Sequence, residues 1–88
     1  MDIDNIKEQW DEHLYANGAT PKFADCEIRY LDDKEPMKVI IKLDSTQDVQ
    51  DNLIFFYCDG LADLLSLCEE DNGEDFVITD FYGFCDTI

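Results

Sequence analysis

The sequence predicts one α+β domain spanning residues 1–88, with a four-stranded antiparallel or mixed sheet and helices packed on one face. Its 88 residues are enough to form one small core. Apolar residues make up 45% of the chain, too many for a disordered acidic tail even at a net charge of −16. The apolar pattern follows the order α-β-β-β-α-β, and such runs of strands favour an antiparallel or mixed sheet.

The first predicted element is an amphipathic helix near the N-terminus. Its apolar side chains recur at steps of three or four residues: Ile3, Ile6, Trp10 and Leu14. The pair Asn17-Gly18 favours the left-handed conformation found just after helices, and Pro21 prevents the helix from continuing. We therefore expect this helix to end at residues 17–18.

Two strands follow, at residues 24–31 and 38–43, because apolar and polar residues alternate there with a period of two. The inward-facing residues of the first strand are Ala24, Cys26, Ile28 and Tyr30, and those of the second are Val39, Ile41 and Leu43. A polar turn of hairpin length, residues 32–36, joins the strands. We expect antiparallel pairing between them.

The third predicted strand is a continuous apolar run at residues 53–58. Such a run indicates a strand covered on both faces, which places it centrally in the sheet or under a packed helix. The preceding polar residues 44–52 fit a loop or a short helical turn.

A second helix and a last strand complete the predicted fold. Asp59 is the expected N-cap of the helix, and Asn72-Gly73 is its expected end. Its buried stripe consists of Leu61, Leu64, Leu65 and Cys68. The β-prone residues 76–81 form the last strand. Gly83 is expected to bend the chain, leaving an apolar tail, Phe84, Cys85 and Ile88, that docks on the core or on a partner.

Charge is distributed unevenly along the chain. All six basic residues lie in the first 42 positions, whereas residues 43–88 carry twelve acids and no Lys or Arg. Net charge governs association and solubility rather than fold or catalysis. The acidity predicts binding to a basic surface of another protein, and it disfavours nucleic acid and anionic membranes as direct partners.

Nine residues are the candidate partner-binding set, because exposed acids attract basic surfaces and aromatic residues anchor interfaces: Asp59, Asp63, Glu69, Glu70, Asp71, Glu74, Asp75, Tyr82 and Phe84. In its sharper form the function is mimicry of nucleic acid, since carboxylates one helical turn apart are ~6 Å apart, a spacing similar to that of neighbouring phosphates. Alternatively, the protein is an accessory subunit or a homodimer that assembles through an edge strand or the C-terminal tail, and acidity serves only solubility.

Catalytic, cofactor and metal motifs are absent from the sequence. His13 is the only histidine, and the four isolated glycines form neither a phosphate-binding loop nor a dinucleotide fingerprint. The acidic residues 69–75 do not follow the ligand register of a calcium loop. We therefore expect a protein that is not an enzyme and binds no cofactor or metal. The less favoured alternative, a small enzyme, would require a pocket containing a carboxylate of raised pKa.

The four cysteines show no C-x-x-C spacing: Cys26, Cys58, Cys68 and Cys85. The first three are in phase with neighbouring apolar residues, so we expect buried, reduced thiols and a reducing compartment. If Met1 is the native start, the expected location is the cytoplasm, because the acidic first residues lack the features of a secretory signal. The sequence also contains no apolar run long enough to span a membrane.

Overall fold

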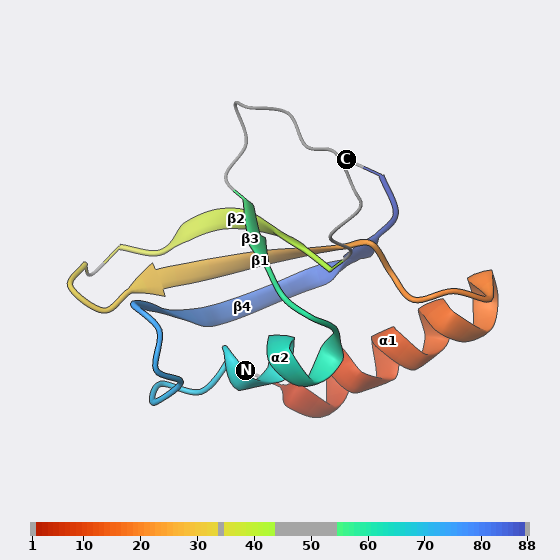
Figure 1. Cartoon of the computed structure of the whole chain (residues 1–88), viewed down its shortest axis with the longest axis horizontal. Helices are drawn as coiled ribbons and strands as arrows, with labels where there is room; N and C mark the ends of the chain where they lie inside the picture. Colours follow the sequence, from red (N-terminus) through yellow and green to blue (C-terminus); the bar gives the residue numbers. More distant parts are fainter. Residues whose placement is uncertain (1, 34, 44–54, 88) are drawn as a thin grey trace.

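The computed structural model describes residues 2–33, 35–43 and 55–87. Two helices and four strands follow the predicted order: α1 (Ile3–Asn17), β1 (Phe23–Tyr30), β2 (Met37–Lys42), β3 (Phe55–Tyr57), α2 (Leu61–Ser66) and β4 (Phe76–Cys85). The four strands form one mixed sheet (Figure 1). The predicted α+β class is therefore confirmed. Residues 44–52, for which a loop or a helical turn was expected, lie outside the described residues.

The sheet has the strand order β3-β2-β1-β4. β1 pairs antiparallel with both β2 and β4, as expected for the first hairpin, whereas β2 pairs parallel with β3. Of the two positions expected for the third strand, central in the sheet or under a packed helix, the central one is wrong, because β3 forms an edge of the sheet. Phe56 packs against the core, but Tyr57 on the other face is 49% exposed. The aromatic run therefore reflects strand propensity more than burial on both faces.

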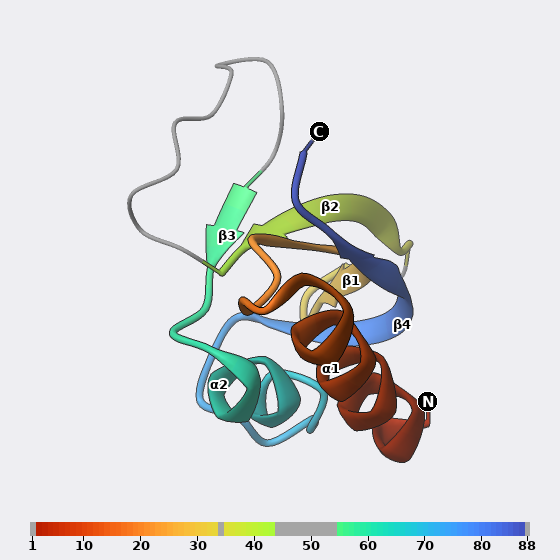
Figure 2. The same cartoon turned by 90° about the vertical axis from the view of Figure 1, so that its right-hand side faces the viewer.

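Both helices lie on one face of the sheet, as predicted, and pack side by side there (Figure 2). The core fills the space between the two layers and contains inward-facing residues of β1 and β2, together with Ile6 of α1 and Leu64 of α2. Ala24, Cys26, Ile28 and Ile41 have no exposed surface. Full burial of an Ile or Leu side chain stabilises the fold by about 1.5–3 kcal/mol, so these positions hold the layers together. No helix in the described ranges is long and apolar enough to cross a membrane.

α1 has the predicted end. Gly18 adopts a left-handed conformation with φ 70°, and its N–H donates a hydrogen bond to Leu14 O at 2.8 Å. At the other end Asp2 caps the helix by accepting a hydrogen bond from Asn5 N at 3.2 Å. Ile6 is buried, whereas Leu14 is 41% exposed. The apolar stripe therefore reaches the core mainly through its N-terminal half.

α2 differs from the prediction at both ends. Gly60, at φ 92°, occupies the N-cap position in place of Asp59, and the Asp59 N–H donates instead to Asp63 Oδ2 at 2.9 Å. The helix ends at Ser66 rather than at Asn72-Gly73. An L residue rarely adopts the conformation of Gly60. No side chain caps this end of the helix, and the Asp63 carboxylate instead binds the N–H of Asp59, the residue before the N-cap. Its early end leaves a long turn before β4.

β4 is longer than predicted because the chain does not bend away at Gly83. Eight of the ten residues of β4 pair with the eight residues of β1, and the register shifts twice. Thr79 and Tyr82 are the extra residues of the two β-bulges. The expected bend at Gly83 is therefore wrong. Of the two positions expected for the apolar tail, docking on the core holds for Phe84, which packs against the core cluster, and Cys85 pairs with Phe23. Ile88 lies outside the described residues.

Candidate functional site

The fold separates charge by layer. The four strands carry three acids and three bases, so their formal charge is zero. Residues 2–18, which contain α1, hold five acids and one lysine. Residues 59–75, which contain α2 and the turn before β4, hold seven acids and no base. We call residues 59–75 the acidic segment. The helical layer is therefore strongly negative and the sheet is neutral.

The acidic segment contains all seven acids of the candidate set, and every one of them is exposed: Asp59, Asp63, Glu69, Glu70, Asp71, Glu74 and Asp75. Across the described ranges the only ion pair joins His13 to Asp86, outside this segment. Asp63 accepts the Asp59 N–H, but no basic side chain within the described part of the chain neutralises these acids. Their charge is available to a partner.

A single amide side chain closes the turn of the acidic segment. Asn72 Nδ2 lies 3.2 Å from Leu67 O, 2.9 Å from Glu69 O and 3.1 Å from Phe76 O. Asn72 Oδ1 accepts a hydrogen bond from Glu74 N at 2.8 Å. Because an amide has two N–H groups, at least one of them is shared between two of the three carbonyl groups. Asn72 therefore fixes the backbone that carries the acids of the turn.

Tyr82 lies apart from the acidic segment, on the sheet face that points away from the helices. Its hydroxyl donates to a carboxylate oxygen of Glu27, and Lys38 Nζ is 5.0 Å from its ring centroid. The hydrogen bond to the Glu27 carboxylate, with smaller contributions from desolvation and nearby acids, raises the pKa of Tyr82 to about 12. Tyr82 is 46% exposed.

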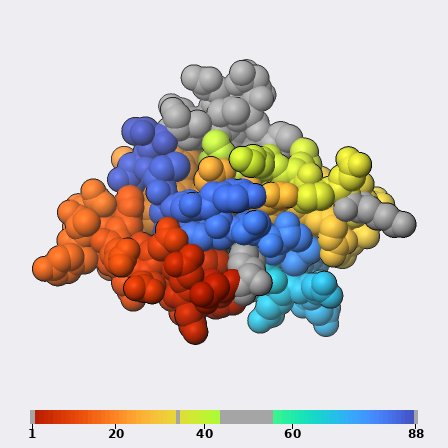
Figure 3. Space-filling model, turned by 180° about the vertical axis from the view of Figure 1, so that it is seen from behind, coloured from red at the N-terminus to blue at the C-terminus, as the bar shows by residue number. Residues whose placement is uncertain are grey.

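Phe84 faces the opposite way, toward α1. Its ring centroid is 5.6 Å from that of Trp10 and 4.8 Å from that of Phe81. The nine candidate residues therefore lie in three places: the acidic segment, the outer face of the sheet, and the space between α1 and β4. Figure 3 shows α1 (red to orange) against β4 (blue), with the turn of the acidic segment (cyan) at the lower right of the same view.

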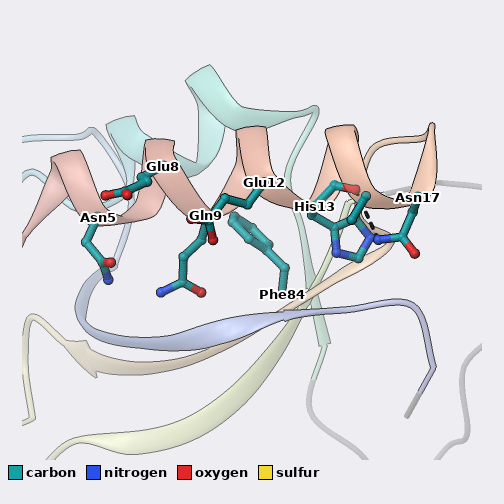
Figure 4. A pocket seen from close by; sticks show the side chains of 8 residues that line it. Asn5, Glu8, Gln9, Glu12, His13, Asn17 and Phe84 are labelled. Carbon is teal, nitrogen blue, oxygen red and sulfur yellow. Dashed lines mark hydrogen bonds between the residues drawn. The ribbon is translucent and has the colours of Figure 1, made fainter.

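An open groove of about 490 Å³ runs between α1 and the C-terminal part of β4. We call it the α1–β4 groove. Its walls are polar side chains of α1, and Phe84 rises from β4 into it (Figure 4). His13 lies in this groove, and its Nε2 is 3.0 Å from Asp86 Oδ1. Sequence reasoning missed the pair because its members are 73 positions apart.

The thiols do not form a reactive centre. All four cysteines are free, and Cys26 and Cys58 have no exposed surface. Burial raises the pKa of Cys58 to about 12 and that of Cys68 to about 11, and it raises the pKa of Cys26 further. Such thiols are weak nucleophiles because the thiolate is the reactive form. Within the described ranges, no three His, Cys, Asp or Glu residues are grouped to hold a metal ion.

Comparisons of the chain with protein-family models, with curated proteins and with solved structures found no match.

Proposed function

We propose that this protein is a non-enzymatic binding module whose acidic segment docks on a basic surface of another protein. One observation carries the proposal: seven exposed acids, with no basic partner among the residues that the structure describes, lie on one segment next to strands of zero formal charge. Acidity needed only for solubility would not have to gather on one layer. A concentrated field of one sign steers a basic partner to this side and speeds association.

The like charges of the segment also favour a partner energetically. The segment holds seven carboxylates within residues 59–75, and two carboxylates ~6 Å apart repel by about 0.7 kcal/mol in water. A basic surface relieves several such repulsions together. The Asn72 hydrogen bonds hold the turn in one conformation, so less conformational entropy is lost on binding.

The sharper form of this function is competition with nucleic acid. A partner that normally binds phosphates offers the row of Lys and Arg side chains that the acidic segment requires. Asp25 and Glu27 of β1 contribute less to such mimicry, because Arg29, Lys38 and Lys42 balance them on the strands. The residues that imitate phosphates are then those of the acidic segment.

Competition binding tests both forms. A panel of basic nucleic-acid-binding proteins is mixed with labelled DNA at low salt, and displacement by this protein is measured with rising ionic strength. The test variant Glu70→Gln/Asp71→Asn/Glu74→Gln is compared with Asp11→Asn/Asp32→Asn/Glu35→Gln, which removes the same charge from exposed acids elsewhere.

We expect the test variant to bind at least fivefold more weakly and the control variant to stay within twofold of the native protein. Steep weakening with salt is expected as well. If no panel member is displaced, mimicry is rejected. Equal losses in the two variants would show that overall charge, rather than the acidic segment, governs binding.

Assembly through an edge strand finds less support than docking of the acidic segment. β3 has three residues, and β4 carries two β-bulges, which are features that protect sheet edges from pairing. The C-terminal tail is also less free than such an assembly would require, because the Phe84 ring packs against those of Trp10 and Phe81.

A further inference from the structure

The α1–β4 groove has a chemical character different from that of the acidic segment. No residue of α2 lines it. Asn5 and Gln9 extend from α1 toward β4, and the ring of Phe84 points toward the helix between them and His13 (Figure 4). The groove therefore combines polar walls with an aromatic floor.

The walls offer acceptors that the described residues leave without a partner. Glu8, Gln9 and Glu12 make no side-chain hydrogen bond or ion pair within the described part of the chain. Glu8 and Glu12 are exposed and one helical turn apart, so their carboxylates repel each other. His13, the only basic group lining the groove, is already paired with Asp86. The groove is thus complementary to a cation that donates several hydrogen bonds.

The floor favours a planar cation. Phe84 is partly exposed, and its ring is held by an edge-to-face contact with Trp10 at an interplanar angle of 77°. A guanidinium group stacks on aromatic faces and presents five N–H donors in one plane, whereas an ammonium group is a compact, strongly hydrated point charge.

We propose that the α1–β4 groove binds the guanidinium group of an arginine side chain from a basic partner protein. The arginine stacks against Phe84 and donates hydrogen bonds to Glu8 and Glu12. The groove adds a residue-specific contact to the charge attraction of the acidic segment. The inference rests on the proposed function for the source of this arginine. Its occupation is nevertheless measurable without any partner, because Trp10 is the only tryptophan and contacts Phe84.

The experiment titrates the native protein with blocked tetra-arginine and tetra-lysine peptides at low salt and follows Trp10 fluorescence. The variant Glu8→Gln/Glu12→Gln removes two charges from the groove. The variant Asp32→Asn/Glu35→Gln removes the same two charges from exposed acids outside both the groove and the acidic segment, and serves as the matched control. Far-ultraviolet circular dichroism verifies that both variants are folded.

We expect a saturable change in Trp10 fluorescence, with at least fivefold tighter binding of the arginine peptide than of the lysine peptide. Glu8→Gln/Glu12→Gln should weaken arginine binding at least fivefold, and Asp32→Asn/Glu35→Gln less than twofold. Equal affinity for the two peptides, equal losses in the two variants, or no Trp10 response would overturn the inference. None of these outcomes would refute docking of the acidic segment, which the displacement experiment tests separately.

Discussion

Replacing Asn72 by alanine should be among the most destabilising changes at a partly exposed polar residue. The substitution removes two N–H donors that serve three carbonyl groups and one acceptor that serves the Glu74 N–H. A hydrogen bond contributes about 1 kcal/mol net, so loss of three should lower the free energy of unfolding by about 2–3 kcal/mol. That is a large fraction of the ~5–15 kcal/mol typical of native domains.

Urea unfolding measures this change, with circular dichroism as the signal and the slope m compared among variants. Asn17→Ala is the control, because Asn17 Nδ2 makes one exposed hydrogen bond, to His13 O at 3.0 Å. Alanine has a higher helix propensity, which offsets most of that loss, so a change below about 0.5 kcal/mol is expected. Asn72→Asp keeps the acceptor but places a carboxylate beside three carbonyl oxygens, and should destabilise at least as much as Asn72→Ala.

The reasoning is refuted if Asn72→Ala lies within about 0.5 kcal/mol of the native protein, or if it equals Asn17→Ala. An additional readout connects this residue to function. Because Asn72 fixes the turn that carries Glu69 to Asp75, Asn72→Ala should also weaken displacement of DNA in the competition experiment, at a temperature where the variant remains folded.

Three further predictions concern burial and ionisation. Raising the pH above the ordinary thiol pKa of 9.0 should reduce stability, because burial keeps Cys26 and Cys58 protonated in the folded state whereas they ionise in the unfolded chain. The free energy of unfolding falls by at most about 1.4 kcal/mol per pH unit for each thiol, and by less where water reaches the thiol. Measurement of this free energy at pH 8 and pH 10 tests the prediction. It is contradicted if Cys58→Ala loses as much stability between the two pH values as the native protein. Ile41→Ala should lower the free energy of unfolding by about 2–5 kcal/mol because Ile41 is fully buried. Lys38 is exposed on the same strand, so Lys38→Ala should lower it by less than about 1 kcal/mol. Similar midpoints of urea unfolding for the two variants would refute this. Glu27→Gln should lower the pKa of Tyr82 from about 12 toward 10.0, because it removes the carboxylate that accepts the hydrogen bond of the tyrosine hydroxyl. Absorbance at 295 nm between pH 9 and 12 detects the shift, and an unchanged titration would show that this hydrogen bond does not raise the pKa of Tyr82.

Local signals predicted the first half of the fold well. The helical period of α1 and its Gly18 end, and the alternation in β1 and β2, depend on nearby residues alone. The second half depends on strand pairing and on side-chain hydrogen bonds, which hydrophobic periodicity does not report. β3 lies at an edge because it pairs parallel with β2, and α2 ends early because Asn72 caps carbonyl groups across the turn. Neither the parallel pairing of β3 nor the hydrogen bonds of Asn72 produce a hydrophobic period in the sequence.

The candidate site was predictable to a similar extent. Exposure of the seven acids follows from the cost of burying unpaired charge, so their place on the surface was foreseeable. The α1–β4 groove was not, because it joins α1 to Phe84 and because His13 meets Asp86 across 73 positions. Sequence periodicity also gave no reason to separate Tyr82 from Phe84.

The two β-bulges of β4 have a consequence for the spacing of its apolar residues. In a regular strand, residues three apart point to opposite faces. Here Ile78, Phe81 and Phe84 all pack against the core, because each interval contains one extra residue, Thr79 or Tyr82. The inward side chains thus recur every third position, a period that resembles a helix more than a strand. Deleting Tyr82 alone would remove the second bulge and leave Phe81 and Phe84 two residues apart, on the same face of the strand, so Phe84 would remain in the floor of the groove while β1 and β4 stayed paired.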